Sequence, residues 1–501
     1  MPWLVVLDHT TSLRHAFGAG LAMCVVFVLG FFGWLPGAIQ SYTGAPWLVC
    51  ALAVVLLSPV IQLQLVVFAC VRHVVRRRGA GLARTALTGA CAYVGGEWLT
   101  PKLFGDTIGY GFLPSPLMRQ AADLAGPFGL TFVLVLANEC VLATLQARRA
   151  SWRAALRPAA TVAALAGALL VYGAVRTWQL AGEPEERPVT AAIIQADVAR
   201  YDRLRAERGT YDAVRAILDV HFALSDEARR RASLDLLIWP ETVYPTTFGA
   251  PKSEEGAAFD REIGAYVGAA GVPLVFGSYD TDDAGEFNAA VFLESSAGGR
   301  LTFDTYRKAA LFPLTERVPG LLDTPTLRRW LPWAGRWTPG TGGEVIALDL
   351  PGGRTIRIAP LICYDAVDGR YARAAVRKGA ELIVTLSNDS WFDDGPGLRL
   401  HLVVSAFRSI ETRRPQLRAT NTGISAVVSA TGELVATASV HEHTALVATV
   451  APVRTATTLV LAWGDWFRPT ALALAVILLA TLPRTRRPAP GARRRTPRQG
   501  A

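Results

Sequence analysis

Cys363 is the residue best suited to chemistry, because it ends an apolar strand and stands close to a carboxylate, in Pro360-Leu361-Ile362-Cys363-Tyr364-Asp365. The other five of the six cysteines lie in long apolar runs, where a thiol acts as a small apolar filler. A thiolate is a strong nucleophile, and a strand-to-helix turn can present it to a substrate. Taken alone, a cysteine at a strand end is more often a core residue, so a catalytic role can be predicted only if a base and a cation accompany it.

Two other apolar segments end in a charged side chain that a thiol nucleophile would use. Glu241 follows an apolar strand and a proline, and Lys308 follows Tyr306 and Arg307, with Glu316 eight residues later. A carboxylate can remove the thiol proton, and an ammonium group can stabilise the thiolate and the oxyanion of a tetrahedral intermediate. Taken alone, Glu241 is a typical acid at a helix start and Lys308 a typical surface cation. Together the three residue types indicate acyl transfer through a thioester.

The elements that position these residues follow a charged linker at 183–187 and alternate between short strands and helices. This alternation predicts an α/β domain. The expected strands are Val189–Gln195, Leu234–Trp239, Val272–Ser278, Ala289–Leu293, Thr355–Cys363, Leu382–Leu386, Ser425–Ser429, Glu433–Ala438 and Ala445–Val450. The expected helices are Tyr211–Arg231, Asp260–Ala270, Gly369–Gly379 and Leu400–Thr412.

Apolar residues outside this domain predict a membrane protein. The chain has 501 residues, of which 51% are hydrophobic. A helix needs roughly 20 apolar residues to cross a bilayer. Stretches that approach this length with little charge occur at 16–36, 47–71, 85–101, 127–146, 158–178 and 458–482. We expect about six spans, with a bundle over 1–180, a catalytic domain over 181–456 and a last helix over 457–482.

The distribution of basic residues predicts the orientation. The net charge is +10, and arginines cluster after the second, fourth and last apolar stretches, whereas the loop at 37–46 has no charge. By the positive-inside rule, both termini are expected in the cytoplasm and the polar domain outside. A cleaved signal peptide is not favoured, because no small-residue cleavage site follows the first stretch. The basic tail at 483–501 is expected to be disordered near anionic lipid, and no folded basic face indicates a nucleic-acid partner.

Metal and nucleotide chemistry are not indicated by the sequence. His441 and His443 flank Glu442, but no third ligand accompanies them, and a solvated hairpin end is the simpler interpretation. No glycine-rich phosphate loop occurs, so we expect no cofactor and no metal site. Glu139 lies inside the fourth apolar stretch, where we expect a structural contact between helices rather than a substrate role.

The ordered motifs resemble the nitrilase, or carbon–nitrogen hydrolase, superfamily, and more narrowly the apolipoprotein N-acyltransferase family of bacterial membrane enzymes. The resemblance covers the chain from about residue 85 onward, and the flanking apolar stretches separate it from soluble nitrilases. It is carried by Trp239-Pro240-Glu241, Tyr306-Arg307-Lys308, Ile362-Cys363-Tyr364-Asp365, Ser387-Asn388-Asp389-Ser390-Trp391-Phe392, His401-Leu402, Arg408, Arg414-Pro415 and Arg418-Ala419-Thr420-Asn421-Thr422-Gly423-Ile424-Ser425.

The resemblance implies a nitrilase-like αββα sandwich domain inserted between transmembrane helices, with its site open towards the outer leaflet. It implies that Glu241 is the base, Lys308 the oxyanion stabiliser and Cys363 the nucleophile. It also implies a substrate-binding set formed by Trp239, Glu316, Tyr364 and Asp365. Two departures stand out: Asp365 replaces the more usual Glu, and about six spans are predicted where the family typically has eight.

The implied reaction moves an acyl group from a phospholipid donor, through a thioester, to the N-terminal amine of a diacylglyceryl-cysteine apolipoprotein. The implied location is the bacterial cytoplasmic membrane, as a multi-pass protein with its catalytic domain on the periplasmic side. One alternative is a membrane-anchored amidase that uses water as acceptor, and another is a transferase for a different amine. A catalytically silent scaffold is disfavoured, because the base, the cation and the nucleophile are all present. The sequence does not predict the oligomeric state.

Overall fold

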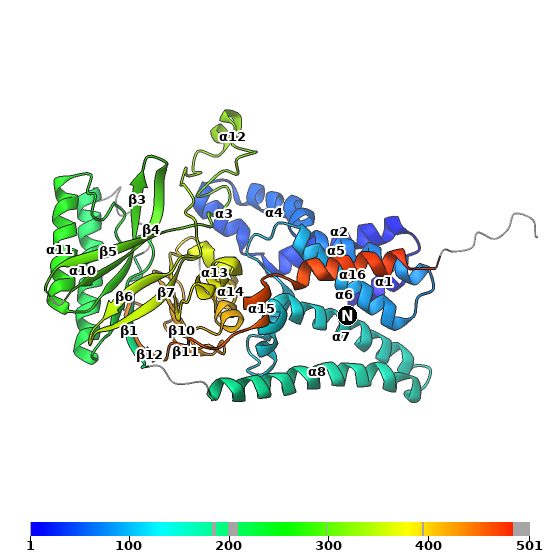
Figure 1. Cartoon of the computed structure of the whole chain (residues 1–501). Helices are drawn as coiled ribbons and strands as arrows, with labels where there is room; N and C mark the ends of the chain where they lie inside the picture. Colours follow the sequence, from blue (N-terminus) through cyan, green and yellow to red (C-terminus); the bar gives the residue numbers. More distant parts are fainter. Residues whose placement is uncertain (1, 183–186, 199–208, 297, 393–394, 484–501) are drawn as a thin grey trace, which may run out of the picture.

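A bundle of helices joined to an α/β domain makes up the chain, in the computed structural model shown in Figure 1. The structure describes residues 2–182, 187–198, 209–296, 298–392 and 395–483. The linker expected at 183–187, apart from Arg187, lies outside the described residues, as does the basic tail beyond residue 483.

The α/β domain contains two six-stranded sheets that pack face to face. The first has the order β12-β1-β2-β3-β4-β5 and comprises β1 (Val189–Gln195), β2 (Leu236–Ile238), β3 (Leu274–Asp282), β4 (Gly285–Ser295), β5 (Leu301–Arg307) and β12 (Thr444–Val450). The second has the order β11-β10-β9-β8-β7-β6 and comprises β6 (Ile346–Leu350), β7 (Arg354–Ile362), β8 (Leu382–Ser387), β9 (Gln416–Thr420), β10 (Ala426–Val428) and β11 (Leu434–Thr437).

Helices cover the outer face of each sheet. The first sheet packs on α10 (Thr210–Arg231) and α11 (Glu254–Ala270), and the second packs on α13 (Gly369–Arg377) and α14 (Pro396–Thr412). Buried aliphatic residues from alternate strand positions fill the space between the sheets and the space under the helices. These layers form the αββα sandwich that the family resemblance implies.

The sequence predictions omit three strands, each for a physical reason. β5 and β6 are edge strands that pair on one side only, and β5 exposes alternate apolar side chains such as Phe303. β9 is fully buried yet contains Gln416 and Arg418, whose polar side chains hide a core strand from a search for apolar runs. The other predicted strands and helices occur, with ends shifted by a few residues.

Strand direction brings four loops to one edge of the sandwich. β2 and β3 are parallel, and the antiparallel pairs β3–β4 and β4–β5 make β5 parallel to β2. In the second sheet, β7, β8 and β9 run parallel. The backbone N–H of Asn388, after β8, donates to Glu241, after β2, so the carboxyl ends of both sheets lie at the same edge.

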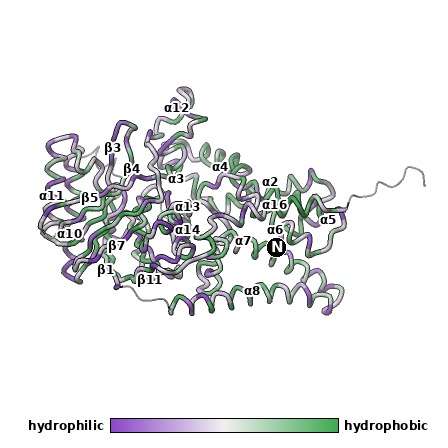
Figure 2. The backbone as a smooth tube through the Cα atoms, in the orientation of Figure 1, coloured by the Kyte–Doolittle hydropathy of each residue, from purple (hydrophilic) through white to green (hydrophobic). Residues whose placement is uncertain are grey.

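The bundle is made mainly of apolar helices, which Figure 2 shows as the more hydrophobic half of the molecule. They are α1 (Pro2–Asp8), α2 (Leu13–Phe31), α3 (Leu35–Thr43), α4 (Trp47–Ile61), α5 (Leu63–Arg77), α6 (Leu82–Leu99), the short 3₁₀ turns Ile108–Phe112 and Met118–Ala121, α7 (Ala122–Arg148), α8 (Trp152–Ala181), α15 (Leu459–Trp463) and α16 (Phe467–Ala480).

Three helices among the described residues are long and apolar enough to cross a membrane: α2, α7 with the turn before it, and α8. α4 and α5 meet the criterion only as a pair, because the chain bends by 47° between them. α16 has only 14 residues, and α6, although continuous over 18 residues, is not among the helices apolar enough to span, as its apolar residues are broken up by Gly95, Gly96 and Glu97. The structure therefore contains a multi-helix apolar bundle, and the count of about six spans stays a prediction.

The acid inside the fourth apolar stretch has a structural partner. Arg72 Nε on α5 donates to Glu139 Oε1 on α7 at 2.5 Å, and Arg72 also pairs with Asp8 at 2.7 Å. All three side chains are buried or nearly so. The expectation of an interhelical contact at Glu139 is confirmed.

Candidate active site

Lys308 and two carboxylates form a buried ionic cluster at the shared edge. Lys308, directly after β5, donates from Nζ to Glu241 Oε1 at 3.0 Å and to Glu316 Oε1 at 2.7 Å. Its side chain is 2% exposed. Although burial acts to lower it, the charges of Glu241 and Glu316 hold the pKa of Lys308 well above its ordinary value, so the ammonium stays charged.

Neighbouring groups fix both carboxylates. Asn288 Nδ2 donates to Glu241 Oε1 at 2.8 Å, and the backbone N–H of Asn388 donates to Oε2 at 2.7 Å. The backbone N–H of Phe312 donates to Glu316 Oε2 at 2.7 Å. Three donors, counting Lys308, therefore hold Glu241 in one orientation.

Cys363 directly follows β7 and begins the 3₁₀ helix Cys363–Val367, so it forms the turn between strand and helix. Its φ is +47°, in the left-handed region that a residue with a Cβ rarely adopts. Such strain persists only where the surroundings impose it, and it is concentrated at functional sites. The thiol is nearly buried, with 7% exposure.

The loop after β8 connects the thiol with the ionic cluster: the backbone N–H of Asn388 donates to Glu241, and a carboxylate oxygen of the next residue, Asp389, lies within 4.8 Å of the Cys363 sulfur. Burial raises the pKa of Cys363, and the negative charge of Glu241 acts in the same direction. The positive charge of Lys308 acts in the opposite direction. The segments of Glu241, Lys308 and Cys363 thus meet at one edge of the sandwich, and the raised pKa keeps the Cys363 thiol protonated unless a base removes its proton.

Asp365 anchors the turn that carries Cys363. It accepts the N–H groups of Ala309 and Ala310 at 3.1 and 2.6 Å, the N–H of Ile362 at 3.0 Å and the hydroxyl of Tyr306 at 2.8 Å. Burial raises its pKa to about 6, against the opposing effect of these hydrogen bonds. Asp365 therefore ties the Cys363 turn to the loop after Lys308, rather than facing open space.

His401 holds the nucleophile from the other side. Its Nε2 lies 3.2 Å from the carbonyl oxygen of Cys363, and its Nδ1 lies 3.0 Å from Asp389 Oδ1. Asp389 accepts in turn from Arg418 at 2.9 Å and from Ser387 at 2.7 Å. Although burial acts to raise it, the charges of Arg418 and His401 hold the pKa of Asp389 far below its ordinary value.

Ligand atoms of Cys363, Asp389 and His401 lie within 4.8 Å of one another, a spacing that a metal ion could use. The buried guanidinium of Arg418 already neutralises Asp389, and a second cation beside it would be repelled. His401 also directs one nitrogen at the Cys363 carbonyl. The cluster therefore fits a positioning network better than a metal site.

Trp239 lies elsewhere than the resemblance implies. Its ring is fully buried under α10, its Nε1 donates to Ser225 at 2.9 Å, and it packs against Phe222 and Phe276. Successive strand residues face opposite sides of a sheet, so Ile238 faces the other sheet and Trp239 faces the helices. The described contacts do not join Trp239 to Cys363, and we leave it out of the substrate-binding set.

Tyr364 connects the nucleophile turn to the bundle. Its hydroxyl donates to the carbonyl of Leu103 at 2.5 Å, and its ring packs edge-on against Phe312. Around it lies a cluster of aromatic rings from four separate segments. The cluster contains Phe32, Trp34, Phe104, Phe312, Trp391 and Phe392.

Sequence reasoning assigned no role to Asn288, His401 or the aromatic cluster. Asn288 lies mid-strand in β4, where nothing in the local pattern distinguishes it. His401 and Asp389 both belong to the motifs that carry the family resemblance, and this membership was the one sign in the sequence that they act together. The structure shows that both side chains are buried. Trp34 and Phe104 come from the bundle part of the chain, so only the tertiary structure brings them against Phe392 of the catalytic domain.

Comparison with known proteins gives two family matches that together span most of the chain. The family model described as carbon-nitrogen hydrolase matches residues 190–458, and the model described as apolipoprotein N-acyltransferase N-terminal domain matches residues 1–140. Among solved structures, the carbon-nitrogen hydrolase of Helicobacter pylori G27 aligns with 56% of this chain and 92% of its own chain. Its sequence identity is 18% and the TM-score is 0.36, so no family assignment is based on it.

Curated relatives share both parts. The apolipoprotein N-acyltransferase of Bdellovibrio bacteriovorus is 29% identical over 483 residues, covering 93% of this chain and 85% of its own. The apolipoprotein N-acyltransferase of Gloeobacter violaceus is 30% identical over 415 residues, covering 81% and 73%. With an acyltransferase-type bundle and a carbon-nitrogen hydrolase domain in one chain, this protein belongs to the apolipoprotein N-acyltransferase family.

Proposed function

We propose that this enzyme transfers an acyl group from a membrane phospholipid, through a thioester on Cys363, to the N-terminal amine of diacylglyceryl-cysteine lipoproteins. The observation that carries the proposal is the strained Cys363 turn beside the Lys308–Glu241 pair. Family membership supports the acyltransferase activity, and the geometry supports the roles of the three residues.

In the first half-reaction, Glu241 takes the proton of Cys363, and the sulfur attacks the ester carbonyl of the phospholipid. The tetrahedral oxyanion develops next to the buried ammonium of Lys308, which stabilises it in a low-dielectric site. The carbon–oxygen bond then breaks, and the departing lysophospholipid oxygen takes the proton held by Glu241. The thioester that remains carries the acyl group.

In the second half-reaction, the amine of the lipoprotein attacks the thioester carbonyl. Glu241 accepts the proton that the amine loses, and the carbon–sulfur bond breaks to return Cys363 as the thiolate, which the proton on Glu241 neutralises. Glu316 shares Lys308 with Glu241 and keeps the ammonium oriented through both steps. Tyr364 and Asp365 position the turn, Tyr364 through the bundle and Asp365 through the loop after Lys308.

Both substrates are lipid-anchored, so a site at the membrane surface gains from proximity. The proposal includes a periplasmic position for the catalytic domain in the bacterial cytoplasmic membrane. The arginines after the second, fourth and last apolar stretches support that orientation.

The test is acyl-adduct formation on the full chain. Incubation with phospholipid carrying a labelled acyl group is expected to label the wild type and not Cys363→Ala, while Cys70→Ala, altered in the bundle, serves as the matched control and keeps the label. Labelling of Cys363→Ala at the wild-type level would contradict the proposal.

The acceptor is tested by adding a diacylated lipopeptide to the labelled enzyme. Transfer of the label to the lipopeptide amine is expected. Release of free fatty acid in place of the triacylated product would instead support the alternative of a membrane-anchored amidase or hydrolase that uses water.

A further inference from the structure

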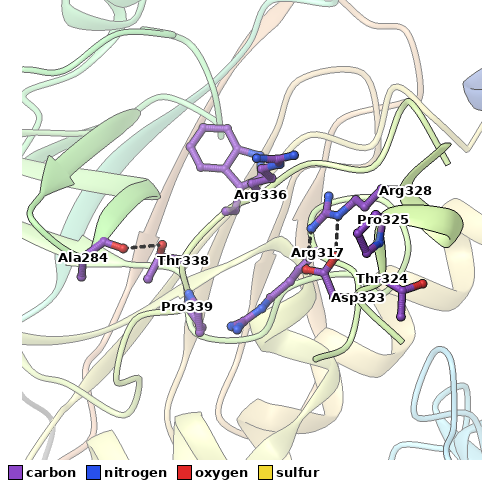
Figure 3. A pocket seen from close by; sticks show the side chains of 10 residues that line it. Ala284, Arg317, Asp323, Thr324, Pro325, Arg328, Arg336, Thr338 and Pro339 are labelled. Carbon is purple, nitrogen blue, oxygen red and sulfur yellow. Dashed lines mark hydrogen bonds and ion pairs between the residues drawn. The ribbon is translucent and has the colours of Figure 1, made fainter. Parts of the chain in front are cut away.

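A charged cavity lies beside the segment Pro313–Pro339, which includes α12 (Pro325–Trp330), outside the candidate active site. Its volume is about 770 Å³, within the range of ligand sites in proteins. Figure 3 shows the side chains of Arg317, Arg328 and Arg336 standing around it, together with one carboxylate, Asp323.

Two of these arginines are left without a carboxylate. Arg328 donates from Nε and Nη2 to the two carboxylate oxygens of Asp323, at 2.7 and 2.9 Å, and its Nη1 donates to two backbone carbonyls. Within the described ranges, no acid forms an ion pair with Arg317 or Arg336. Three guanidinium groups thus face a single carboxylate that is already occupied.

Backbone pairing forces the two unpaired charges together. Arg317 and Arg336 are partners in an antiparallel bridge, where side chains directly opposite lie on the same face. Like charges in this arrangement destabilise the pairing. Neighbouring hydrogen bonds nevertheless maintain it, from Gly335 N–H to the Thr315 carbonyl at 2.5 Å and from Trp337 N–H to the Glu316 carbonyl at 3.2 Å. An anion in the cavity would remove the repulsion.

The chemistry and the position favour one occupant. Guanidinium groups match the oxygens of a phosphate, with short charge-assisted hydrogen bonds. In Figure 1, α12 lies at the same level along the molecule as α3, at the end of the bundle that meets the catalytic domain. The same segment fully exposes Leu321 and exposes 75% of Trp330, side chains that are stable next to lipid. We propose that this cavity binds the phosphate group of a membrane phospholipid.

The site is connected to the candidate active site by covalent structure. Arg317 follows Glu316, whose carboxylate binds Lys308 at 2.7 Å. Filling the cavity would stabilise the Arg317–Arg336 pairing and, through it, the backbone of Glu316. The binding itself does not depend on acyl transfer, so it is tested separately.

The test uses the full chain in non-ionic detergent and a short-chain phosphatidylglycerol with a photoactivatable headgroup. The double variant Arg317→Gln/Arg336→Gln removes both unpaired charges and keeps polar side chains. The matched control is Arg329→Gln, an exposed arginine of α12 that does not line the cavity. Cross-links are mapped by mass spectrometry to residues 313–339.

We expect the double variant to lose labelling by on the order of tenfold, since charged hydrogen bonds are lost, and the Arg329→Gln control to keep it. Dihexanoyl phosphatidylglycerol should displace the probe, whereas dihexanoylglycerol, which lacks phosphate, should not. Undiminished labelling of the double variant would overturn the proposal. Equal displacement by inorganic phosphate at the same concentration would overturn the lipid source.

Discussion

At the scale of single residues, His401 is the side chain whose role most needs a test. It contacts the carbonyl of Cys363 and is itself held by Asp389. We therefore regard it as a positioning residue that helps to maintain the left-handed turn. Displacing a reacting atom by about 1 Å can lower a rate on the order of a hundredfold.

Replacing His401 by Ala is thus expected to slow acyl-adduct formation on the order of a hundredfold, with little change in the KM for phospholipid. His401→Gln retains an N–H near the position of Nε2, so partial recovery of the rate is expected. Single-turnover labelling over a range of phospholipid concentrations measures the rate of adduct formation for both variants and its dependence on phospholipid. A folded His401→Ala enzyme that forms the adduct at the wild-type rate would exclude this role.

Lys308 is expected to control the ionisation of the nucleophile. Its charge lowers the pKa of Cys363 against the effects of burial and Glu241, so Lys308→Met raises that pKa further. A higher pKa means less thiolate at any fixed pH, and alkylation by iodoacetamide at pH 8 should become slower. The pH profile of the alkylation rate should shift to higher pH.

Lys252→Met is the matched control for that experiment, because Lys252 is exposed and pairs only with Glu286 in the described structure. Its alkylation profile should coincide with that of the wild type. A Lys308→Met profile that also coincides, or that shifts to lower pH, would contradict the assignment.

At the scale of elements, the close approach of β3 to the end of β2 positions the base. A Cβ added to Gly277 on β3 would collide with the backbone of Glu241 and Thr242. Gly277→Ala should therefore displace Glu241 and lower the rate of adduct formation by about tenfold or more. Gly268→Ala on α11, where nothing lies within 4 Å, should instead stabilise the protein by about 1 kcal/mol and leave the rate unchanged.

The positions of Glu241 and Cys363 at strand ends could be predicted from the sequence, because each residue follows a short apolar run that is typical of a buried strand. The triad candidates were found by residue type and family resemblance. The facing of Trp239 could have been deduced from strand alternation, since its neighbour Ile238 takes the other face. Contacts such as Asn288 with Glu241, or Trp34 with Phe392, depend on long-range packing that no local pattern contains.

At the scale of the whole molecule, a buried ionic link joins the bundle to the catalytic domain. Arg413, at the end of α14, donates to Asp123 of α7 at 2.6 Å and to the carbonyl of Gln120 at 3.1 Å. Arg176 of α8 also donates to Asp123, at 2.8 Å. The bundle and the catalytic domain are thus held by charges that water does not screen.

Arg413→Met should lower the free energy of unfolding by about 3 kcal/mol, because it leaves part of the charge of buried Asp123 uncompensated. Arg229→Met breaks a largely exposed pair with Asp226 and should cost less than about 1 kcal/mol. Thermal unfolding of the full chain in detergent compares the two. Equal losses of stability would contradict a special role for Arg413.

The hydroxyl of Tyr364, bound to the Leu103 carbonyl, has a consequence for any attempt to dissect the enzyme. An isolated water-soluble fragment would lack the anchor next to its sulfur, even if both sheets assembled normally. We therefore expect the Cys363 turn to keep its shape only in the intact polypeptide, so that screens for inhibitors should use the full chain rather than a truncated version.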